Sequence, residues 1–199
     1  EINHACFNPE DNQSQLSQKL QKNLAITLTG TNYSADQIND AHLSNLEGDS
    51  AIFEGEITGQ FREDSLPSPK ALSLKPGAQI MMTNNDQKQR WINGTMGKVL
   101  RIGQTDDYEN YIRVELETGK RVSVLEATWD MTKFVLENEK LTAKTVGSYK
   151  QLPLKLAWAI TIHKSQGKTF QNVIIDLGPK AFAAGQTYVA LSRCRSLEG

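Results

Sequence analysis

The segment from Ile162 to Phe170, IHKSQGKTF, contains the Gly-Lys-Thr triplet with which phosphate-binding P-loops end. A P-loop wraps phosphates with consecutive backbone N–H groups, which requires another glycine five residues before the Gly of the triplet. That position is Ile162, and residues 148–166 contain no glycine. Residues 171–176 then predict a strand, whereas a P-loop is followed by a helix. The triplet is therefore not a P-loop.

Metal-binding residues are also sparse. Residues 173–176, VIID, form an apolar run that closes on an acid, as magnesium-binding strands do. No second acid follows Asp176 to position a water, so a buried strand that ends at a turn is favoured. Cys6 and Cys194 have no metal-ligand spacing, and we expect free thiols in a reducing compartment. The sequence predicts no metal site in this chain.

Cations gather in the last third of the chain. Residues 140–199 carry nine Lys and Arg against two acids, a net charge of +7, so the remainder carries −8 of the total of −1. Such a region is either a solvated face or the electrostatic footprint of a nucleic-acid or nucleotide site. The pattern alone does not choose between them.

The composition is ordinary for a soluble protein, with 38% apolar and 23% charged residues in 199. No apolar run approaches the roughly 20 residues that a membrane helix needs. Residues 1–11 lack the basic and apolar regions of a secretion signal. We expect no membrane partner, and a location in the bacterial cytoplasm or with the nucleoid.

Three stretches of different pattern must position these residues. Residues 24–32 predict a buried strand, followed by a helix that Ser34 or Asp36 caps and that stops before Gly48. Its apolar positions are Ile38, Ala41, Leu43 and Leu46.

Residues 51–149 instead show short apolar or alternating runs separated by turn signals, which predict a small antiparallel barrel or sandwich. After residue 154 the first pattern returns, with a helix-length segment at 154–166, a buried strand at 172–178 and a helix at 185–196. The simplest architecture is an α/β domain, 1–50 plus 151–199, that a β-rich insert, 51–150, interrupts.

Several segments together resemble superfamily 1 DNA helicases of the PIF and RecD-like type. TIHKSQGKTF (161–170) resembles their motif V, and YVALSRCRSLEG (188–199) resembles their motif VI. LTGTNYSADQIN (28–39) is similar to the TN motif that opens the second RecA-like domain. LKPGAQIMMTNND (74–86) and WINGTMGKV (91–99) resemble the entry to its SH3-like insert. The resemblance covers nearly the whole chain.

The resemblance implies an α/β, RecA-like domain of the P-loop NTPase type, without its own P-loop, interrupted by an SH3-like antiparallel β-barrel. These helicases hold ATP between two RecA-like domains, and the first carries the P-loop lysine and the Mg²⁺-binding acids. This chain has neither, so it is expected to be the second half of a longer protein. ATP and Mg²⁺, single-stranded DNA and the N-terminal RecA-like domain are the expected cofactors and partners.

The resemblance also assigns residues. Arg193 is implied as the arginine finger, on a helix expected to turn Val189, Leu191 and Cys194 inward, while Arg195 is expected to be solvated. The segment implied to approach the nucleotide comprises Gln166, Gly167 and Lys168. Gly167 is alternatively a helix C-cap, and Lys168 alternatively a solvated lysine.

A second set of polar residues is implied to contact DNA phosphates, which positions a strand without reading its sequence. The set comprises Thr31, Asn32, Thr161, His163, Lys164 and Ser165. For His163 the alternative interpretation is a half-buried histidine with a structural role. For residues 31–32 the alternative is an Asx turn. For residues 93–95 a turn is favoured over a DNA contact. For Trp91 a position in the barrel core is favoured over stacking on a base.

The expected function is the C-terminal motor half of an ATP-dependent DNA helicase, inactive by itself. Two alternatives remain, a stand-alone single-strand-binding module and a degenerate helicase fold that serves as an interaction scaffold. Both leave the arginine of the motif VI-like segment without a role.

Overall fold

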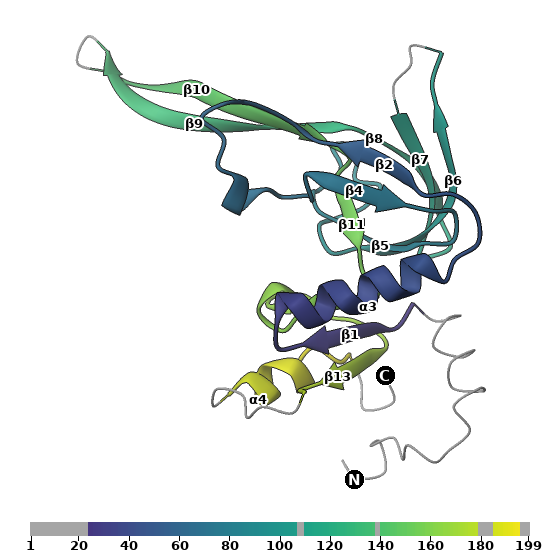
Figure 1. Cartoon of the computed structure of the whole chain (residues 1–199). Coiled ribbons are helices and arrows are strands. Elements are labelled where there is room, and N and C mark those ends of the chain that lie inside the picture. Colours follow the sequence, from purple (N-terminus) through teal and green to yellow (C-terminus); the bar gives the residue numbers. More distant parts are fainter. Residues whose placement is uncertain (1–23, 107–109, 138–139, 179–184, 196–199) are drawn as a thin grey trace, which may run out of the picture. The chain divides into compact units, whose positions relative to one another are not determined.

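The computed structural model describes residues 24–106, 110–137, 140–178 and 185–195 (Figure 1). Cys6 and the rest of residues 1–23 lie outside the described residues. The chain divides into two compact units. Unit 1 combines residues up to 45 with residues from 156 on, and unit 2 comprises residues 46–155. The boundaries expected from the sequence lay at 50/51 and 150/151.

Unit 1 is built on a parallel sheet of order β12-β1-β13, with β1 (Ile26–Thr29) in the centre. Its neighbours are β12 (Ala159–Thr161) and β13 (Val173–Asp176), and both run parallel to it. Ile26 and Leu28 of β1 are completely buried. Parallel strands occur in α/β folds because each connection must cross back over the sheet, so the α/β class predicted for this unit is confirmed.

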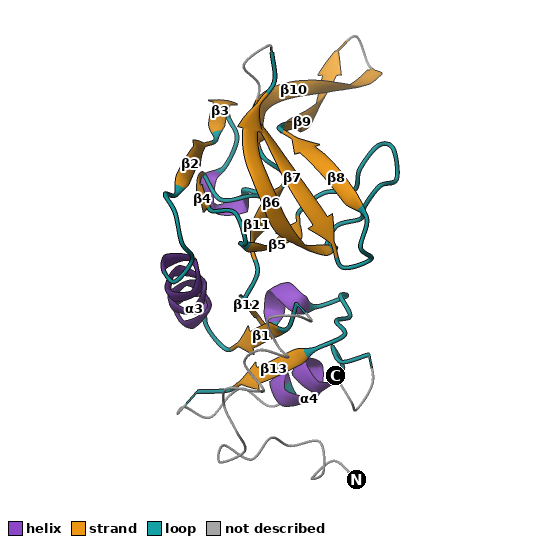
Figure 2. Ribbon diagram, turned by 90° about the vertical axis from the view of Figure 1, so that its right-hand side faces the viewer, coloured by secondary structure: helices purple, strands orange, loops and turns teal. Residues whose placement is uncertain are grey.

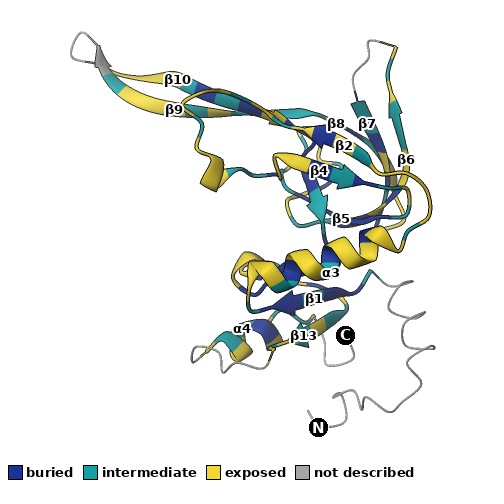
Figure 3. Cartoon of the chain, viewed as in Figure 1, coloured by how far each residue is buried: buried dark blue, intermediate teal, exposed yellow. Residues whose placement is uncertain are grey.

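Helix α3 (Asn32–Ser44) packs on β1 and β12. Its cap is Thr31, whose hydroxyl oxygen accepts the backbone N–H of Ser34 at 3.1 Å, so the helix begins before the predicted caps Ser34 and Asp36. The face against the sheet is formed by residues spaced four apart, Ala35, Asn39 and Leu43, and these side chains are buried (Figure 3). Of the four predicted apolar positions, Leu43 alone is buried among the described residues.

Asn39 joins α3 to the sheet edge. Its side-chain amide donates to the carbonyl of Ala159 at 2.9 Å and accepts the N–H of Ala159 at 3.0 Å. The amide thereby replaces a neighbouring strand for one residue of β12. A polar side chain on the buried face of a helix is stable here because both of its hydrogen-bonding groups are satisfied.

The helix predicted over 154–166 is wrong. The segment forms β11 (Leu154–Leu156), β12 and a single 3₁₀ turn, η2 (His163–Ser165). All three residues of β12 are buried between β1 and the Asn39 amide. A short apolar run that is buried on both faces has no period, so a strand and a helix look alike in sequence.

The C-terminal elements of unit 1 are shorter or more exposed than predicted. β13 alternates between half-buried and exposed side chains instead of being fully buried. Helix α4 spans Gln186–Leu191 and does not reach residue 196. Ala190 is its buried residue, whereas Leu191 is 50% exposed, against the expectation that it turns inward. Arg193 therefore lies just beyond the helix.

Unit 2 contains a five-stranded sheet of order β11-β5-β6-β7-β8, in which β5 to β8 are antiparallel (Figure 2). These strands are β5 (Gln79–Met82), β6 (Met96–Gln104), β7 (Asn110–Leu116) and β8 (Arg121–Leu125). Most of their core-facing residues are β-branched or sulfur-containing, and the buried ones include Ile80, Met82, Val99, Ile112, Val114, Val122 and Val124.

The remaining strands of unit 2 form a three-stranded sheet, β3-β10-β9, and a pair, β2-β4. Their bounds are β2 (Ala51–Glu54), β3 (Glu56–Gly59), β4 (Ala71–Leu74), β9 (Ala127–Glu137) and β10 (Lys140–Gln151), with a 3₁₀ turn, η1 (Glu63–Ser65), between β3 and β4. Unit 2 is thus built largely of antiparallel strands, and these include β4 and β10, which were not among the strand-like runs recognised in the sequence. β9 and β10 form a long ribbon that reaches away from the β5–β8 sheet (Figure 1).

Candidate nucleotide and nucleic-acid site

The three parallel strands of unit 1 end side by side. Thr29, the last residue of β1, is in register with Thr161 of β12 and with Asp176 of β13. The N–H of Ile162 donates to the carbonyl of Thr29 at 2.9 Å, which keeps the two departing segments together. Ligands of open parallel sheets bind beyond the carboxyl ends of the strands. The candidate residues at 31–32 and 163–164 both follow this edge directly.

Thr31 and Asn32 leave β1 as exposed residues. The hydroxyl of Thr31 caps α3 and lies 2.9 Å from the hydroxyl of Ser34. Because threonine caps the helix, the predicted alternative of an Asx turn at Asn32 is not formed. Within the described part of the chain the Asn32 amide makes no hydrogen bond, and it faces solvent at the first position of α3.

Two of the residues expected to contact DNA are buried instead. Ser165 is 0% exposed, and its hydroxyl donates to the carbonyl of Ile162 at 2.6 Å. Thr161 is 6% exposed, and its hydroxyl oxygen accepts the N–H of Lys164 at 3.3 Å. Their hydroxyls hold the 3₁₀ turn together, so we correct their assignment from phosphate contacts to residues that shape this turn.

His163, Lys164 and Gln166 are the exposed side chains of the same turn. The alternative of a half-buried histidine at His163 is therefore wrong. Imidazole and ammonium groups on a rigid exposed turn are suited to contacts with phosphate oxygens.

Gly167 closes the turn in a left-handed conformation, with φ +74°. A residue with a Cβ is strained at this φ even though no atom would block the Cβ. The predicted helix C-cap is not present, because Gly167 follows a 3₁₀ turn, in which the N–H of Lys168 donates to the carbonyl of Ser165 at 3.0 Å. Lys168 itself is half-buried, and partial burial lowers the pKa of its ammonium below the ordinary value.

The segments at 168–170 and 193–195 lie side by side. The N–H of Phe170 donates to the carbonyl of Arg193 at 2.9 Å, and the N–H of Arg195 donates to the carbonyl of Phe170 at 3.0 Å. Phe170 is buried and anchors the pair. The structure thus brings together the two segments that are expected to approach the nucleotide. Lys168 and Arg193, which belong to these segments, are 25 positions apart in the sequence.

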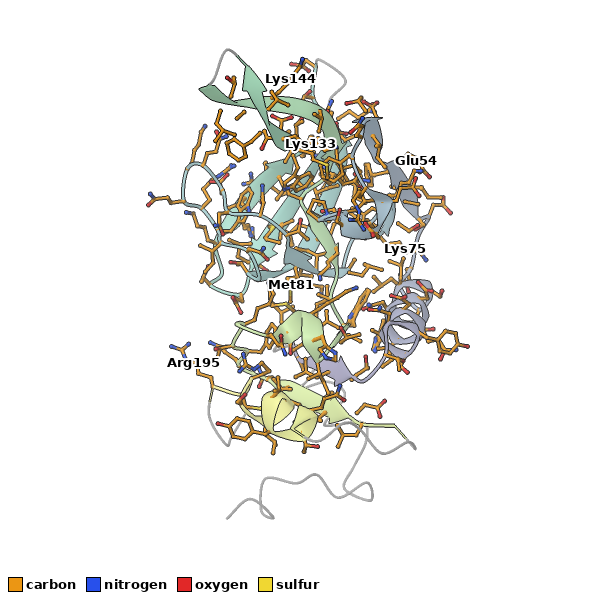
Figure 4. The ribbon with its side chains drawn as sticks, turned by 90° about the vertical axis from the view of Figure 1, so that its left-hand side faces the viewer. Glu54, Lys75, Met81, Lys133, Lys144 and Arg195 are labelled. Carbon is orange, nitrogen blue, oxygen red and sulfur yellow. The ribbon has the colours of Figure 1, made fainter. Side chains whose placement is uncertain are left out.

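The Arg193 guanidinium is held by three acceptors. Its Nε donates to the carbonyl of Val189 at 3.0 Å, one terminal nitrogen donates to the carbonyl of Lys168 at 3.2 Å, and the other donates to the Ser192 hydroxyl at 2.8 Å. Arg195 is exposed, and its side chain projects away from the ribbon (Figure 4). The two arginines of this segment therefore differ, because Arg193 is positioned and Arg195 is solvated.

No family model matches the chain, whereas comparison with individual proteins finds relatives over most of it. The ATP-dependent DNA helicase Pif1 of Bdellovibrio bacteriovorus is 34% identical over 170 residues, which cover 83% of this chain and 36% of that relative. The chain belongs to the Pif1 helicase family. It spans about a third of the length of this curated relative.

Solved Pif1 structures share the fold. Unliganded Pif1 from Bacteroides sp. matches with a TM-score of 0.83 and 35% identity over 96% of this chain and 42% of that one. Pif1 from Bacteroides in complex with ADP-AlF3 and ssDNA matches with a TM-score of 0.74 and 33% identity over the whole chain and 43% of that one. The helicase-type RecA-like fold expected from the sequence is confirmed.

Two further expectations for this Pif1 homologue concern unit 2. Trp91 is 6% exposed, and its Nε1 donates to Asn84 Oδ1 at 3.1 Å, while the Arg90 guanidinium lies 4.5 Å from its ring centroid. Trp91 is therefore a core residue, as favoured, and is not available to a base. Residues 93–95 form the favoured turn, in which the N–H of Asn93 donates to Asn85 Oδ1 at 2.8 Å.

The described residues of this Pif1 homologue contain no group of three or more His, Cys, Asp and Glu side chains that could hold a metal ion. Asp176 at the end of β13 accepts the N–H of Gly178 at 2.9 Å, so the strand ends in a turn as favoured. Among the helices that the structure describes, none is long and apolar enough to cross a bilayer.

Proposed function

We propose that this chain is the C-terminal motor half of an ATP-dependent DNA helicase. It grips single-stranded DNA at the carboxyl edge of the β12-β1-β13 sheet and supplies Arg193 to an ATP site. The observation that carries the proposal is the hydrogen bond from the Arg193 guanidinium to the carbonyl of Lys168, which joins the two segments expected to meet the nucleotide. The Pif1 of Bacteroides solved with ADP-AlF3 and ssDNA supports it.

Arg193 acts as the arginine finger in this proposal. A guanidinium carries five N–H donors in one plane, and the contacts to Val189, Lys168 and Ser192 leave further N–H groups for a phosphate oxygen. Because these contacts fix the plane of the group, little ordering is needed when negative charge develops on the γ-phosphate. Lys168 adds a second cation in a partly dehydrated position, where its attraction to phosphate is stronger than in water.

The DNA contact uses the exposed members of the predicted set, Thr31, Asn32, His163 and Lys164. They follow two adjacent strands whose ends are in register at Thr29 and Thr161. Amide, imidazole and ammonium donors at one edge bind phosphate oxygens without reading bases. We therefore expect binding that is independent of sequence and weakened by salt.

The N-terminal RecA-like domain of the longer protein completes the ATP site in this proposal. That domain supplies the P-loop lysine and the acids that hold Mg²⁺, since no P-loop sequence is present in this chain. Unit 2 is the SH3-like insert, a description that its short antiparallel strands support. Opening and closing of the two RecA-like domains then moves the motor along the strand.

The test is a comparison of DNA-stimulated ATP hydrolysis in the longer protein and in its His163→Ala/Lys164→Ala variant. The proposal expects the variant to need several-fold more single-stranded DNA for half-maximal stimulation, with the maximal rate nearly retained. Glu47→Ala/Asp49→Ala, at exposed positions beyond α3, is the control. Unchanged DNA requirement in the first variant contradicts a DNA grip at this edge.

A further inference from the structure

The outer face of the β6-β7-β8 sheet carries cations in a regular arrangement. In the register of these strands Arg101 of β6 lies directly opposite Arg113 of β7, and Arg113 lies opposite Ser123 of β8. The three residues form one row across the adjacent strands β6, β7 and β8, whose order Figure 2 shows. Their sequence neighbours Ile112 and Val124 point to the core, so the row faces solvent, and both arginines are exposed.

A β-bulge produces this row. The register of β6 and β7 shifts between Val99 and Arg101, which leaves Leu100 as an extra residue. Before the bulge Val99 pairs with Val114 on the buried face, and after it Arg101 pairs with Arg113 on the exposed face. In regular pairing without the bulge, Leu100 would lie opposite Arg113, and Arg101 would lie opposite Ile112 on the core side of the sheet.

The positive charges of Arg101 and Arg113 are not neutralised by an acidic residue within the row. Like charges directly opposite one another destabilise an antiparallel pair. In the described part of the chain no carboxylate lies within salt-bridge distance of either arginine, and Arg113 donates to the neutral hydroxyl of Ser123 at 2.9 Å. The stability of the fold therefore gives no reason for this pair, whereas a bound anion between the two guanidinium groups would remove their repulsion.

The two adjacent rows differ in kind. On one side Glu115 lies opposite Lys98 and Arg121, and Arg121 Nε donates to its carboxylate at 2.9 Å. This row has two cations for one acid, a net charge of +1, and the acid lies between the two cations. The repulsion is thus concentrated in the row of Arg101 and Arg113.

On the other side lies an aromatic and apolar row. Tyr111 lies opposite Gly103 of β6 and Leu125 of β8, and Leu125 is 46% exposed. A Cβ on Gly103 would stand 2.7 Å from the Tyr111 ring, so the glycine allows the ring to lie across β6. The half-buried ring is a flat surface next to the unpaired arginines.

We propose that this outer face of β6-β7-β8 is a second nucleic-acid contact, in which Arg101 and Arg113 hold a phosphodiester and Tyr111 stacks on an adjacent base. Planar guanidinium groups bind phosphate oxygens in pairs. In a nucleic acid a phosphate can bind the row of arginines while the adjacent base stacks on the row that contains Tyr111. An acidic peptide would bind the arginines alone. The contact belongs to unit 2 and stands whether or not the edge of unit 1 binds DNA.

The test uses the 199-residue chain and a labelled oligothymidylate of about 20 nucleotides, with polarisation at about 50 and 200 mM salt. Arg101→Gln/Arg113→Gln should lose about tenfold in affinity at the lower salt, and its log–log salt slope should fall by about 1.4. Arg62→Gln/Lys70→Gln removes the same charge from exposed ion pairs of unit 2 and should lose less than twofold. Equal losses in both variants overturn the proposal.

Two further variants distinguish a specific contact from misfolding of the variant and from non-specific electrostatic attraction. Arg101→Lys/Arg113→Lys keeps the charge but not the planar fork, and should lose a measurable part of the affinity. Tyr111→Leu should weaken binding roughly three- to tenfold without a change in salt slope. If poly-glutamate of equal charge displaces the oligonucleotide as effectively as unlabelled oligothymidylate does, the face binds acidic protein and the nucleic-acid assignment is wrong.

Discussion

At the residue scale, the two arginines of the motif VI-like segment are the most informative pair. Both have the same side chain and stand two residues apart, yet Arg193 is fixed by three hydrogen bonds and Arg195 is exposed. The difference arises from the pairing of the segment with Phe170, which turns one arginine toward Lys168 and the other to solvent. A catalytic role in the proposed site therefore belongs to Arg193.

In the longer protein, Arg193→Ala should lower DNA-stimulated kcat by at least roughly 10²-fold and change nucleotide Kd far less. The reason is that an arginine finger stabilises mainly the transition state, where fingers contribute about 10³ to 10⁵ in rate. Arg193→Lys should recover little, because a point ammonium cannot replace the planar fork. Arg195→Ala is the matched control and should retain most activity. Hydrolysis by Arg193→Ala within a few-fold of the parent rules the assignment out.

At the element scale, polar side chains hold the functional segments in place. Asn39 joins α3 to β12, Thr161 and Ser165 shape the η2 turn, and Asp86 organises the loop between β5 and β6. The Asp86 carboxylate accepts Arg90 Nε at 2.8 Å and also backbone N–H groups of the loop. None of these residues is proposed to touch a ligand, and each has a stability consequence.

Asn39→Leu should destabilise unit 1 by about 2–4 kcal/mol, because both backbone groups of Ala159 lose their partner in a buried position. Asp40→Ala, at an exposed position of the same helix, should change stability by less than about 0.5 kcal/mol. Urea unfolding of the two variants measures the difference. Equal midpoints would show that the Asn39 amide is dispensable.

The Asp86–Arg90 pair should make unit 2 sensitive to acid. The side-chain hydrogen bond from Arg90 lowers the pKa of Asp86 from 3.8 to about 2. A carboxyl with a depressed pKa stabilises the fold above its unfolded pKa, and this stability is lost as the pH falls from about 4 to about 2.

Asp86→Asn should therefore cost about 1–2 kcal/mol near neutral pH, reduced by solvent screening because the Arg90 side chain is 33% exposed. The penalty should shrink toward pH 2, where about half of the wild-type Asp86 carboxyls are also uncharged. Thermal unfolding from pH 7 to pH 2 measures it, and Asp64→Asn, in an exposed pair with Arg62, should show no such convergence. A penalty that is constant with pH would argue against the pair.

At the scale of the whole molecule, the chain spans about a third of its curated relative and, on our proposal, provides one side of an ATP site. Purified 1–199 with ATP, Mg²⁺ and single-stranded DNA should release phosphate at the background rate, because no P-loop sequence is present. Phosphate release that persists through repurification and rises in proportion to the chain would contradict the half-motor proposal.

The same chain should bind single-stranded DNA weakly and without regard to sequence. The charge of +7 in residues 140–199 leads us to expect a Kd of about 10⁻⁴ to 10⁻⁶ M at physiological salt. Titrations of oligonucleotides of different sequence at two salt concentrations test this. Affinity that does not respond to salt, or that favours one sequence, would exclude a grip on the phosphate backbone.

The amino-acid sequence by itself determined the family, the α/β class and the β-rich insert. The motif-like segments at 161–170 and 188–199 are contiguous in sequence, and strands such as β7 and β8 carry a period of two that needs no tertiary information. It also excluded a P-loop, because that motif depends on the local position of a glycine.

Only the tertiary structure decided which of the candidate residues are available to a ligand. Thr161, His163, Lys164 and Ser165 are all polar and adjacent, and their exposure differs because β12 is buried beside β1 and the 3₁₀ turn satisfies two hydroxyls internally. The pairing of Phe170 with the segment around Arg193 is likewise invisible in sequence. Burial and long-range register depend on neighbours distant in the chain, and a local pattern carries no information about them.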